Sequence, residues 1–328
     1  VVEYQTYGTA SWTAGPTITE VNRVTVPGVN GTRYTYRVAS TNNSGQRSAW
    51  GSYCLFGWGE QASSSVPIPF GRGALAGKTI TNITAGLDHT CAVTSDGTAA
   101  CWGWNGLGQL GDGTTTQSNT PVAITGGALA GKTVTNITAG EYHTCAVLSD
   151  GTAACWGWNG LGQLGDGTTN NSNTPVAVTG GALAGKMVTN ITAGEYHTCA
   201  VLSDGTAACW GDNDNGQLGD GTTNNSNTPV AVTGGALAGK TVTNITASYY
   251  HTCAVTSDGT AACWGDNDNG QLGNGTTSKS NTPVAVTGGA LAGKTVTNIT
   301  ASYYHTCAVL SDGTAACWGY NGNGQLGD

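Results

Sequence analysis

The segment His89-Thr90-Cys91-Ala92-Val93, followed by Cys101-Trp102-Gly103, determines how this 328-residue chain is organised. Both motifs recur four more times, with first histidines at residues 143, 197, 251 and 305, always 54 residues apart. A fixed period of this length indicates repeated supersecondary units that bury their apolar faces against one another. The repeat is therefore the frame for every other inference from the sequence.

One repeat, residues 133–186, predicts four short strands, which we name A to D in chain order. They are expected at about residues 134–139, 143–148, 152–158 and 174–179. Turn-forming or glycine-rich segments separate them: residues 140–142, Ser149-Asp150-Gly151, the long loop 159–173, and 180–186. Four antiparallel strands per repeat indicate a β-propeller blade. We expect an all-β propeller of five near-identical blades plus a partial one.

The cysteines follow the same period. Ten of the eleven form pairs that flank Ser-Asp-Gly: Cys91-Cys101, Cys145-Cys155, Cys199-Cys209, Cys253-Cys263 and Cys307-Cys317. A three-residue loop with glycine in the left-handed region places each pair directly opposite on a hairpin, whereas a two-residue loop separates them onto opposite faces. We expect five cross-strand disulfides, with buried free thiols as the alternative. Disulfides indicate a secreted or cell-surface protein.

Composition excludes several functional classes. The net charge of -8 argues against a nucleic-acid partner, which requires a basic surface. Without a run of eighteen apolar residues, we expect no membrane insertion. The cysteine spacing does not match zinc sites, and the five histidines lie in separate blades, where each is expected to make a hydrogen bond within its own blade. We therefore expect no metal, no cofactor and no catalytic residues.

Two acidic segments leave one alternative open. Asp212-Asn213-Asp214-Asn215-Gly216 and its copy at residues 266–270 resemble the start of a calcium loop. An EF-hand has glycine at its sixth position and glutamate at its twelfth, and neither is present here. Weak calcium binding at these C–D loops stays an alternative.

The repeat also resembles a known family. Ala-Gly-Glu-Tyr-His-Thr-Cys-Ala-Val-Leu-Ser-Asp-Gly-Thr, beginning at Ala139, and Cys-Trp-Gly-x-Asn-x-x-Gly-Gln-Leu-Gly-Asp-Gly, beginning at Cys155, are similar to regulator of chromosome condensation repeats. The resemblance covers about residues 54–328 and implies a β-propeller, commonly of seven blades. Five copies and a partial one then correspond to an incomplete seven-bladed propeller.

The N-terminal segment, residues 1–52, has a different pattern. Val1–Tyr4, Trp12, Asn22–Val26 and Tyr34–Ser40 before Asn42-Asn43-Ser44-Gly45 resemble the later strands of a fibronectin type III domain. We expect a partial β-sandwich at 1–52, a propeller at 53–328, and a fragment of a longer modular protein. Unpaired Cys54 then belongs to a C strand whose disulfide partner lies in an A–B hairpin beyond residue 328. A first alternative is that Cys54 belongs to a degenerate, unpaired first copy of the repeat. A second alternative is that residues 66–70 supply the missing D strand and close a propeller of five blades.

Differences between the copies concentrate in two loops that strand alternation places on one face of the propeller. Candidates in the A–B loops are Leu87, Asp88, Glu141, Tyr142, Glu195, Tyr196, Tyr249, Tyr250, Tyr303 and Tyr304. Candidates in the C–D loops are Trp104, Leu107, Trp158, Leu161, Asp212, Asp214, Asp266, Asp268 and Tyr320. Loops also drift without selection. The aromatic, apolar and acidic types of these substitutions instead favour a binding face.

These observations predict an extracellular, non-catalytic module that presents one propeller face to an unknown protein or glycan target. An accessory propeller of a larger secreted enzyme is the main alternative. The family resemblance by itself implies a third function, an exchange factor for a small GTPase on chromatin. The acidic charge and the paired cysteines argue against it.

Overall fold

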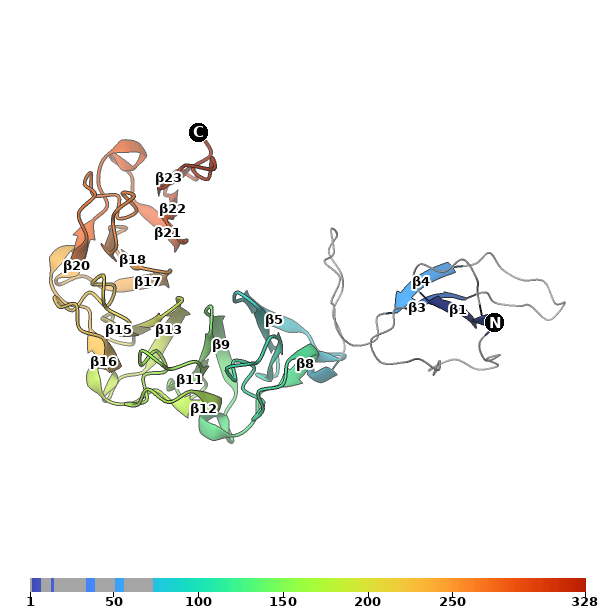
Figure 1. Cartoon of the computed structure of the whole chain (residues 1–328). Helices are drawn as coiled ribbons and strands as arrows, with labels where there is room; N and C mark the ends of the chain where they lie inside the picture. Colours follow the sequence, from blue (N-terminus) through green and yellow to red (C-terminus); the bar gives the residue numbers. More distant parts are fainter. Residues whose placement is uncertain (1, 7–12, 15–33, 39–50, 56–72) are drawn as a thin grey trace. The chain divides into compact units, whose positions relative to one another are not determined.

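Each repeat folds into an antiparallel sheet whose strands are hydrogen-bonded in chain order (Figure 1). The computed structural model describes residues 2–6, 13–14, 34–38, 51–55 and 73–328. The A strands are β5 (Ile80–Ala85), β9 (Val134–Ala139), β13 (Val188–Ala193), β17 (Val242–Ala247) and β21 (Val296–Ala301). The B strands are β6 (His89–Thr94), β10 (His143–Leu148), β14 (His197–Leu202), β18 (His251–Thr256) and β22 (His305–Leu310).

The outer strands complete the blades. The C strands are β7 (Ala99–Gly103), β11 (Ala153–Gly157), β15 (Ala207–Gly211), β19 (Ala261–Gly265) and β23 (Ala315–Gly319). The D strands are β8 (Ser118–Ala123), β12 (Ser172–Ala177), β16 (Ser226–Ala231) and β20 (Ser280–Ala285). One-turn 3-10 helices precede the A strands: η1 (Gly73–Leu75), η2 (Gly127–Leu129), η3 (Gly181–Leu183), η4 (Gly235–Leu237) and η5 (Gly289–Leu291). The predicted four-stranded blades are confirmed, with strand boundaries within two residues of the expected ones.

The chain divides into two units, Val1–Phe70 and Gly71–Asp328. In the first unit, β1 (Val2–Thr6), β2 (Thr13–Ala14), β3 (Tyr34–Val38) and β4 (Gly51–Leu55) form an antiparallel sheet in the order β2-β1-β3-β4. β4 places Cys54 opposite Thr35, so this cysteine lies in the N-terminal sheet and not in the C strand of a blade. The boundary expected after residue 52 falls within β4. The fibronectin type III interpretation stays a prediction.

The B–C hairpin has the predicted register. Cys91 lies directly opposite Cys101, and Gly97, with φ of 77°, donates its N–H to the carbonyl of Thr94 at 2.8 Å. This positive φ is the reason that glycine ends the three-residue loop. All five expected pairs are disulfides, with Cα–Cα distances of 4.0 to 4.1 Å.

A lysine pairs with the aspartate of each B–C turn. Lys78 Nζ lies 3.1 Å from Asp96 Oδ2, and the four other copies pair at 2.7 to 3.0 Å. Asp96 Oδ1 also accepts a hydrogen bond from the Thr98 N–H at 3.0 Å. Pairs this exposed contribute little to stability, because water and salt screen them. Their main effect is to leave the end of the propeller that carries the B–C turns, which we call the turn face, without net charge.

The hydrophobic core lies between adjacent blades. At the first interface, Val93 and Leu110 of one blade pack with Ile137 and Trp156 of the next. The buried indole N–H of Trp156 donates to the backbone carbonyl of Gln109 at 2.9 Å. The equivalent tryptophans at residues 210, 264 and 318 repeat this contact at the following interfaces. A blade therefore buries its apolar face only when its neighbour is present.

The histidines also connect neighbouring blades, which corrects the expectation that their hydrogen bonds stay within each blade; His251 in addition has Ser248 Oγ of its own blade 2.8 Å from Nδ1. His89 Nε2 lies 2.8 Å from the hydroxyl of Thr144, which itself donates to the Gln109 carbonyl at 2.9 Å. The Thr144 oxygen is thus the acceptor, so His89 carries its proton on Nε2. Burial lowers the pKa of His89 to about 4 and that of His143 to about 3. The ring is neutral because no counter-charge offsets its desolvation.

The five blades follow an arc, with the A strands along its inner edge and the D strands along its outer edge (Figure 1). The two ends of the arc are uncovered in residues 73–328: Ile83 is 51% exposed, whereas its copy Ile137 is 2% exposed. Val309, in the last blade, is exposed in the same way. Closure by residues 66–70 lies outside the described residues, so the number of blades stays a prediction.

Among the described residues, no helix has the length and apolar character needed to span a bilayer.

A thiol count tests the cysteine assignment. Titration of the denatured, unreduced chain should detect one free thiol, from Cys54, because the other ten cysteines are disulfide-bonded. After reduction the same assay should detect all eleven. Eleven thiols before reduction would contradict the disulfides.

Acidification should destabilise the propeller well before its carboxylates are protonated. Four buried histidines, at residues 89, 143, 197 and 251, have pKa values lowered by burial to about 3 or 4. Below pH 6.5 the unfolded chain takes up protons that the folded chain excludes, so stability falls until the pH reaches the lowered pKa values. Each pKa unit corresponds to about 1.4 kcal/mol per histidine.

Melting temperatures between pH 7 and pH 4 measure this loss. His197→Gln keeps a donor for the neighbouring threonine but cannot titrate, so its melting temperature should depend less steeply on pH. A slope equal to that of the unmodified chain would contradict the assignment of a neutral, buried imidazole.

Candidate binding face

The A–B and C–D loops meet at one end of each blade, opposite the turn face. The N–H of Trp104, at the start of a C–D loop, donates to the carbonyl of Asp88 in the A–B loop at 2.8 Å. The same bond joins Trp158 to Tyr142 and Tyr320 to Tyr304, at 3.0 and 2.9 Å. These bonds fix the two loops against each other, as strand alternation predicts. We call this end of the propeller the loop face.

Aromatic side chains on the loop face form one continuous series of ring contacts. Tyr142 contacts Trp158 at a centroid distance of 6.1 Å, and Trp158 contacts Tyr196 at 5.4 Å. The series continues into the last two blades, where Tyr249 and Tyr303 are 3.9 Å apart. We call it the aromatic stripe, and its members are Tyr142, Trp158, Tyr196, Tyr249, Tyr250, Tyr303, Tyr304 and Tyr320. The stripe crosses four blades.

The other sequence-predicted residues differ in exposure. Exposed members of the whole candidate set are Leu87, Asp88, Trp104, Asp214, Asp268, Tyr303, Tyr304 and Tyr320. Half-buried members are Leu107, Glu141, Tyr142, Trp158, Leu161, Tyr196, Tyr249 and Tyr250. Glu195, Asp212 and Asp266 are buried, so they are not part of the exposed surface of the loop face.

Two of the buried candidates organise their own C–D loops. Asp212 accepts hydrogen bonds from the Asp214 N–H at 3.3 Å and from the side-chain amide of Gln217 at 2.7 Å. Burial raises the pKa of Asp212. Asp266 accepts the equivalent amide bond from Gln271 at 2.7 Å. The carboxylates are thus engaged by the chain itself, and no group of three or more His, Cys, Asp or Glu in the described residues could hold a metal ion.

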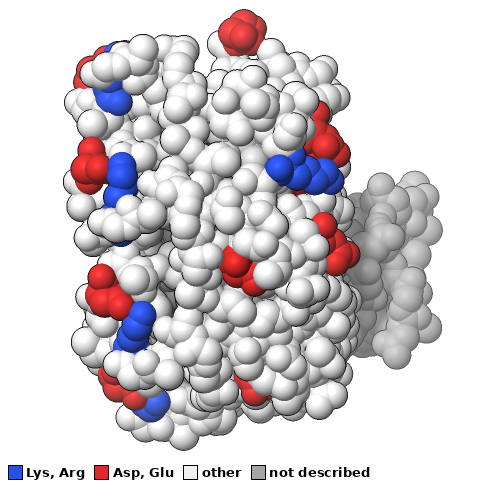
Figure 2. All heavy atoms as spheres, turned by 90° about the vertical axis from the view of Figure 1, so that its left-hand side faces the viewer, with Lys and Arg blue, Asp and Glu red and all other residues white. Residues whose placement is uncertain are grey.

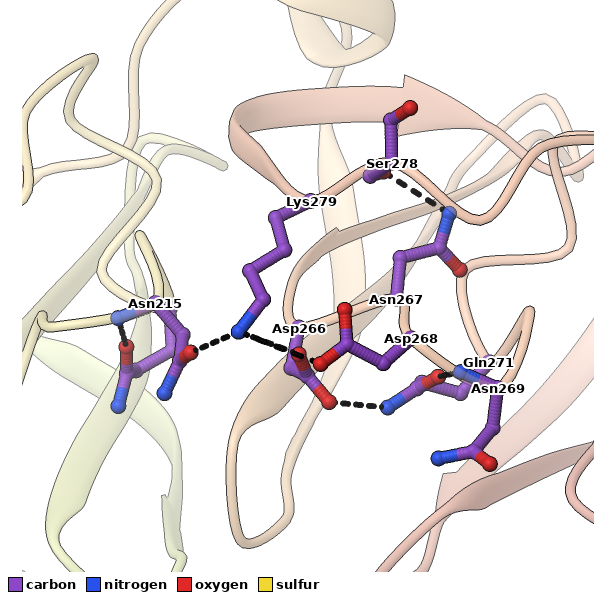
Figure 3. Close-up of polar contacts among 9 residues, drawn as sticks. Asn215, Asp266, Asn267, Asp268, Asn269, Gln271, Ser278 and Lys279 are labelled. Atoms are coloured by element: carbon purple, nitrogen blue, oxygen red, sulfur yellow. Dashed lines mark hydrogen bonds and ion pairs between the residues drawn. The ribbon is translucent and has the colours of Figure 1, made fainter.

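Lys279 was missed by the sequence analysis, although it is the one lysine in a C–D loop and stands where other copies have Gln117, Asn171 or Asn225. Figure 3 shows its ammonium group between two blades. Nζ lies 2.9 Å from Asp266 and 3.6 Å from Asp268, and it donates to Asn215 of the preceding blade at 2.7 Å. The hydrogen bond with Asp266 raises the pKa of Lys279. An ammonium group can therefore be held by oxygen atoms of this face.

A hollow of about 380 Å³ lies where the A strands reach the loop face. Glu141 and Glu195 line it from the second and third blades, and Tyr249 and Tyr303 line it from the last two. Burial, with Glu141 nearby, raises the pKa of Glu195 to about 8. Its carboxyl is therefore mostly protonated at neutral pH, which favours the folded state at lower pH. This opposes the effect of the histidines, but only one carboxyl acts against four imidazoles.

The comparisons with known proteins now identify the fold family. The profile of the RCC1-like domain family matches residues 39–328. The chain belongs to this family. The resemblance to regulator of chromosome condensation repeats is thereby confirmed, whereas the fibronectin type III resemblance has no such support.

Two curated relatives set the scale of the similarity. The ultraviolet-B receptor UVR8 of Arabidopsis thaliana is 33% identical over 281 residues, which is 84% of this chain and 62% of the receptor. The human E3 ubiquitin-protein ligase HERC2 is 33% identical over 237 residues, which is 72% of this chain and 5% of the ligase. The chain thus spans less than two thirds of the length of either relative. The activities named for these relatives are those of the full-length proteins.

A solved structure shows the same fold. Yeast RCC1 (Prp20), crystallised with bound Kap60, superposes with a TM-score of 0.63 at 19% identity, over 75% of this chain and 57% of that chain. An identity this low supports the shared propeller architecture and not a shared ligand.

Two neighbouring tryptophans test the division between core and face. Trp156→Ala should lower the free energy of unfolding by about 3–5 kcal/mol, because it removes a fully buried ring and its bond to Gln109. Trp158→Ala should cost about 1 kcal/mol, since it loses mainly ring contacts with Tyr142 and Tyr196. Urea unfolding monitored by circular dichroism measures both. Equal losses would place Trp158 in the core and remove it from the face.

Proposed function

We propose that the loop face is a recognition surface for a protein or glycan target and that the propeller itself is not catalytic. The aromatic stripe carries this proposal. Eight rings joined by successive pair contacts cross four blades, and Tyr303, Tyr304 and Tyr320 are exposed. Aromatic side chains supply large contact areas at a small entropic cost, and they anchor both protein and sugar partners.

We further propose that the protein acts outside the cell. Five disulfides support this location, because such bonds persist in oxidising compartments and are rare in the cytosol. The chain contains only eleven lysines and arginines in 328 residues. This low content argues against a nucleic-acid ligand, which requires a basic surface.

A second candidate function is that of an accessory propeller within a larger enzyme. The similarity to HERC2 supports this second candidate, because the segment of HERC2 that is similar to this chain makes up only 5% of a much longer ligase. The two candidates differ in what lies elsewhere in the full-length protein. A catalytic domain in the complete open reading frame would favour the accessory role.

Target capture tests the recognition face. The triple variant Trp104→Ala, Trp158→Ala, Tyr320→Ala should still fold, with a melting temperature lowered by only a few degrees, and should lose capture of the target, because all three side chains lie on the loop face. Immobilised chain exposed to the native extracellular fraction and to a glycan array measures capture, with bound proteins identified by mass spectrometry.

A control variant addresses non-specific adsorption. Ser95→Ala, Ser149→Ala, Ser203→Ala changes three exposed residues of the turn face and should capture the same target as the unmodified chain. Capture retained by the aromatic variant, or lost equally by both variants, would contradict recognition through the loop face.

A further inference from the structure

The hollow at the inner edge of the loop face combines two carboxyl groups with aromatic rings. It is lined by the first residues of the A–B loops from all five blades. Glu141 and Glu195 line it from the second and third blades, and Tyr249 and Tyr303 from the fourth and fifth. Aromatic faces attract cations through the negative potential of the ring, and carboxylates attract them directly. The lining therefore suits a positively charged group.

One carboxyl oxygen of Glu195 lacks a hydrogen-bond partner. Its side chain is 4% exposed, and Oε2 has no hydrogen-bond partner among the described residues. The titratable groups around it are acids or phenols: Glu141, Asp212, Tyr142, Tyr196, Tyr249 and Tyr303. None of these groups can neutralise an ionised Glu195. A buried carboxyl in such surroundings stays protonated until a cation enters.

The charges of the propeller are divided between its two ends. Residues 73–328 contain six lysines, no arginine and sixteen aspartates or glutamates. Five lysines pair with the five turn aspartates on the turn face. The remaining charged residues, eleven acidic residues and Lys279, lie in the A–B and C–D loops or in the segment that follows β23. Figure 2 shows paired blue and red groups along one edge, whereas red groups prevail elsewhere.

Lys279 shows which cation this face accommodates. Its ammonium group is held by the carboxylates of Asp266 and Asp268 and by the amide oxygen of Asn215 (Figure 3). The hollow offers the same type of oxygen atoms from Glu141 and Glu195, without a lysine of the described chain to fill it. A primary ammonium, a compact charge with three donors, matches two carboxyl groups that approach from different blades.

We propose that the hollow between Glu141, Glu195, Tyr249 and Tyr303 receives a lysine side chain from a partner polypeptide. This assignment rests on the proposed function, because it names the chemistry by which the loop face recognises a protein. The ammonium group pairs with the carboxyl of Glu195, whose buried Oε2 has to turn toward the hollow, and the rings of Tyr249 and Tyr303 contact the charge or its methylene stem. The aromatic stripe supplies the surrounding contact area.

Binding then couples to a proton. Glu195 has a pKa of about 8 in the free protein, so an entering ammonium group displaces its proton at neutral pH. Affinity should rise as the pH increases from 6 toward 8, while lysine stays charged. Proton release near pH 7 distinguishes this site from exposed carboxylates, which are already ionised at that pH.

Calorimetry on the full chain with pentalysine tests the proposal, with penta(Nε-acetyl)lysine and pentaarginine as comparison peptides. Titrations at pH 7 in buffers of different ionisation enthalpy measure the protons released. Pentalysine should bind with proton release, and both comparison peptides should bind at least about tenfold more weakly. Glu195→Gln should abolish the proton release and weaken pentalysine binding by about tenfold or more.

Matched variants keep the result interpretable. Asp204→Asn makes the same carboxyl-to-amide change in the same blade but on the turn face, so it should bind pentalysine as the unmodified chain does. Glu141→Gln provides a second substitution in the hollow, with folding of each variant checked by circular dichroism. Equal binding of lysine and acetyl-lysine peptides, equal binding of pentaarginine, or unchanged binding and proton release in folded Glu195→Gln would overturn the proposal.

The outcome also separates this proposal from the proposed function. If the triple aromatic variant loses target capture while Glu195→Gln binds pentalysine normally, the lysine assignment fails and the recognition face stands. If the aromatic variant keeps its target, the recognition face itself fails.

Discussion

The propeller depends on the backbone carbonyl of Gln109 and its copies. This oxygen is buried at the interface between blades and accepts two hydrogen bonds from the next blade, from Thr144 and from Trp156. A buried carbonyl without donors costs free energy, so the next blade is held in the one position that supplies both. The Nε2–H of His89 then donates a hydrogen bond to the hydroxyl oxygen of Thr144. The spacing of the loops, and hence the continuity of the aromatic stripe, follows from this arrangement.

Most of the fold could be predicted because it depends on local chemistry. Ser95-Asp96-Gly97 sets the hairpin register, and that register places Cys91 opposite Cys101, whatever surrounds the blade. The destination of the His89 hydrogen bond could not be predicted in this way. Identical repeats offer the same threonine within a blade and in its neighbour, and only the packing of two sheets selects Thr144.

The candidate face was predictable to the level of loops but not of individual side chains. Strand alternation places the A–B and C–D loops together, as the bond between Trp104 and Asp88 shows. Burial of Glu195 and Asp212 depends on contacts with adjacent loops and blades, which a linear pattern does not contain. Lys279 illustrates the same limit, since its contact with Asn215 joins residues 64 positions apart.

The pairing of Lys132 with Asp150, repeated in every blade, has an electrical consequence beyond its small effect on stability. Within residues 73–328 it cancels the charge of the turn face and leaves the acidic charge on the loop face, so the propeller carries a permanent dipole along the axis around which the blades are arranged. A positively charged protein that diffuses nearby is turned toward the acidic end before any contact forms. Such steering accelerates encounter and weakens as added salt shortens the range of the field.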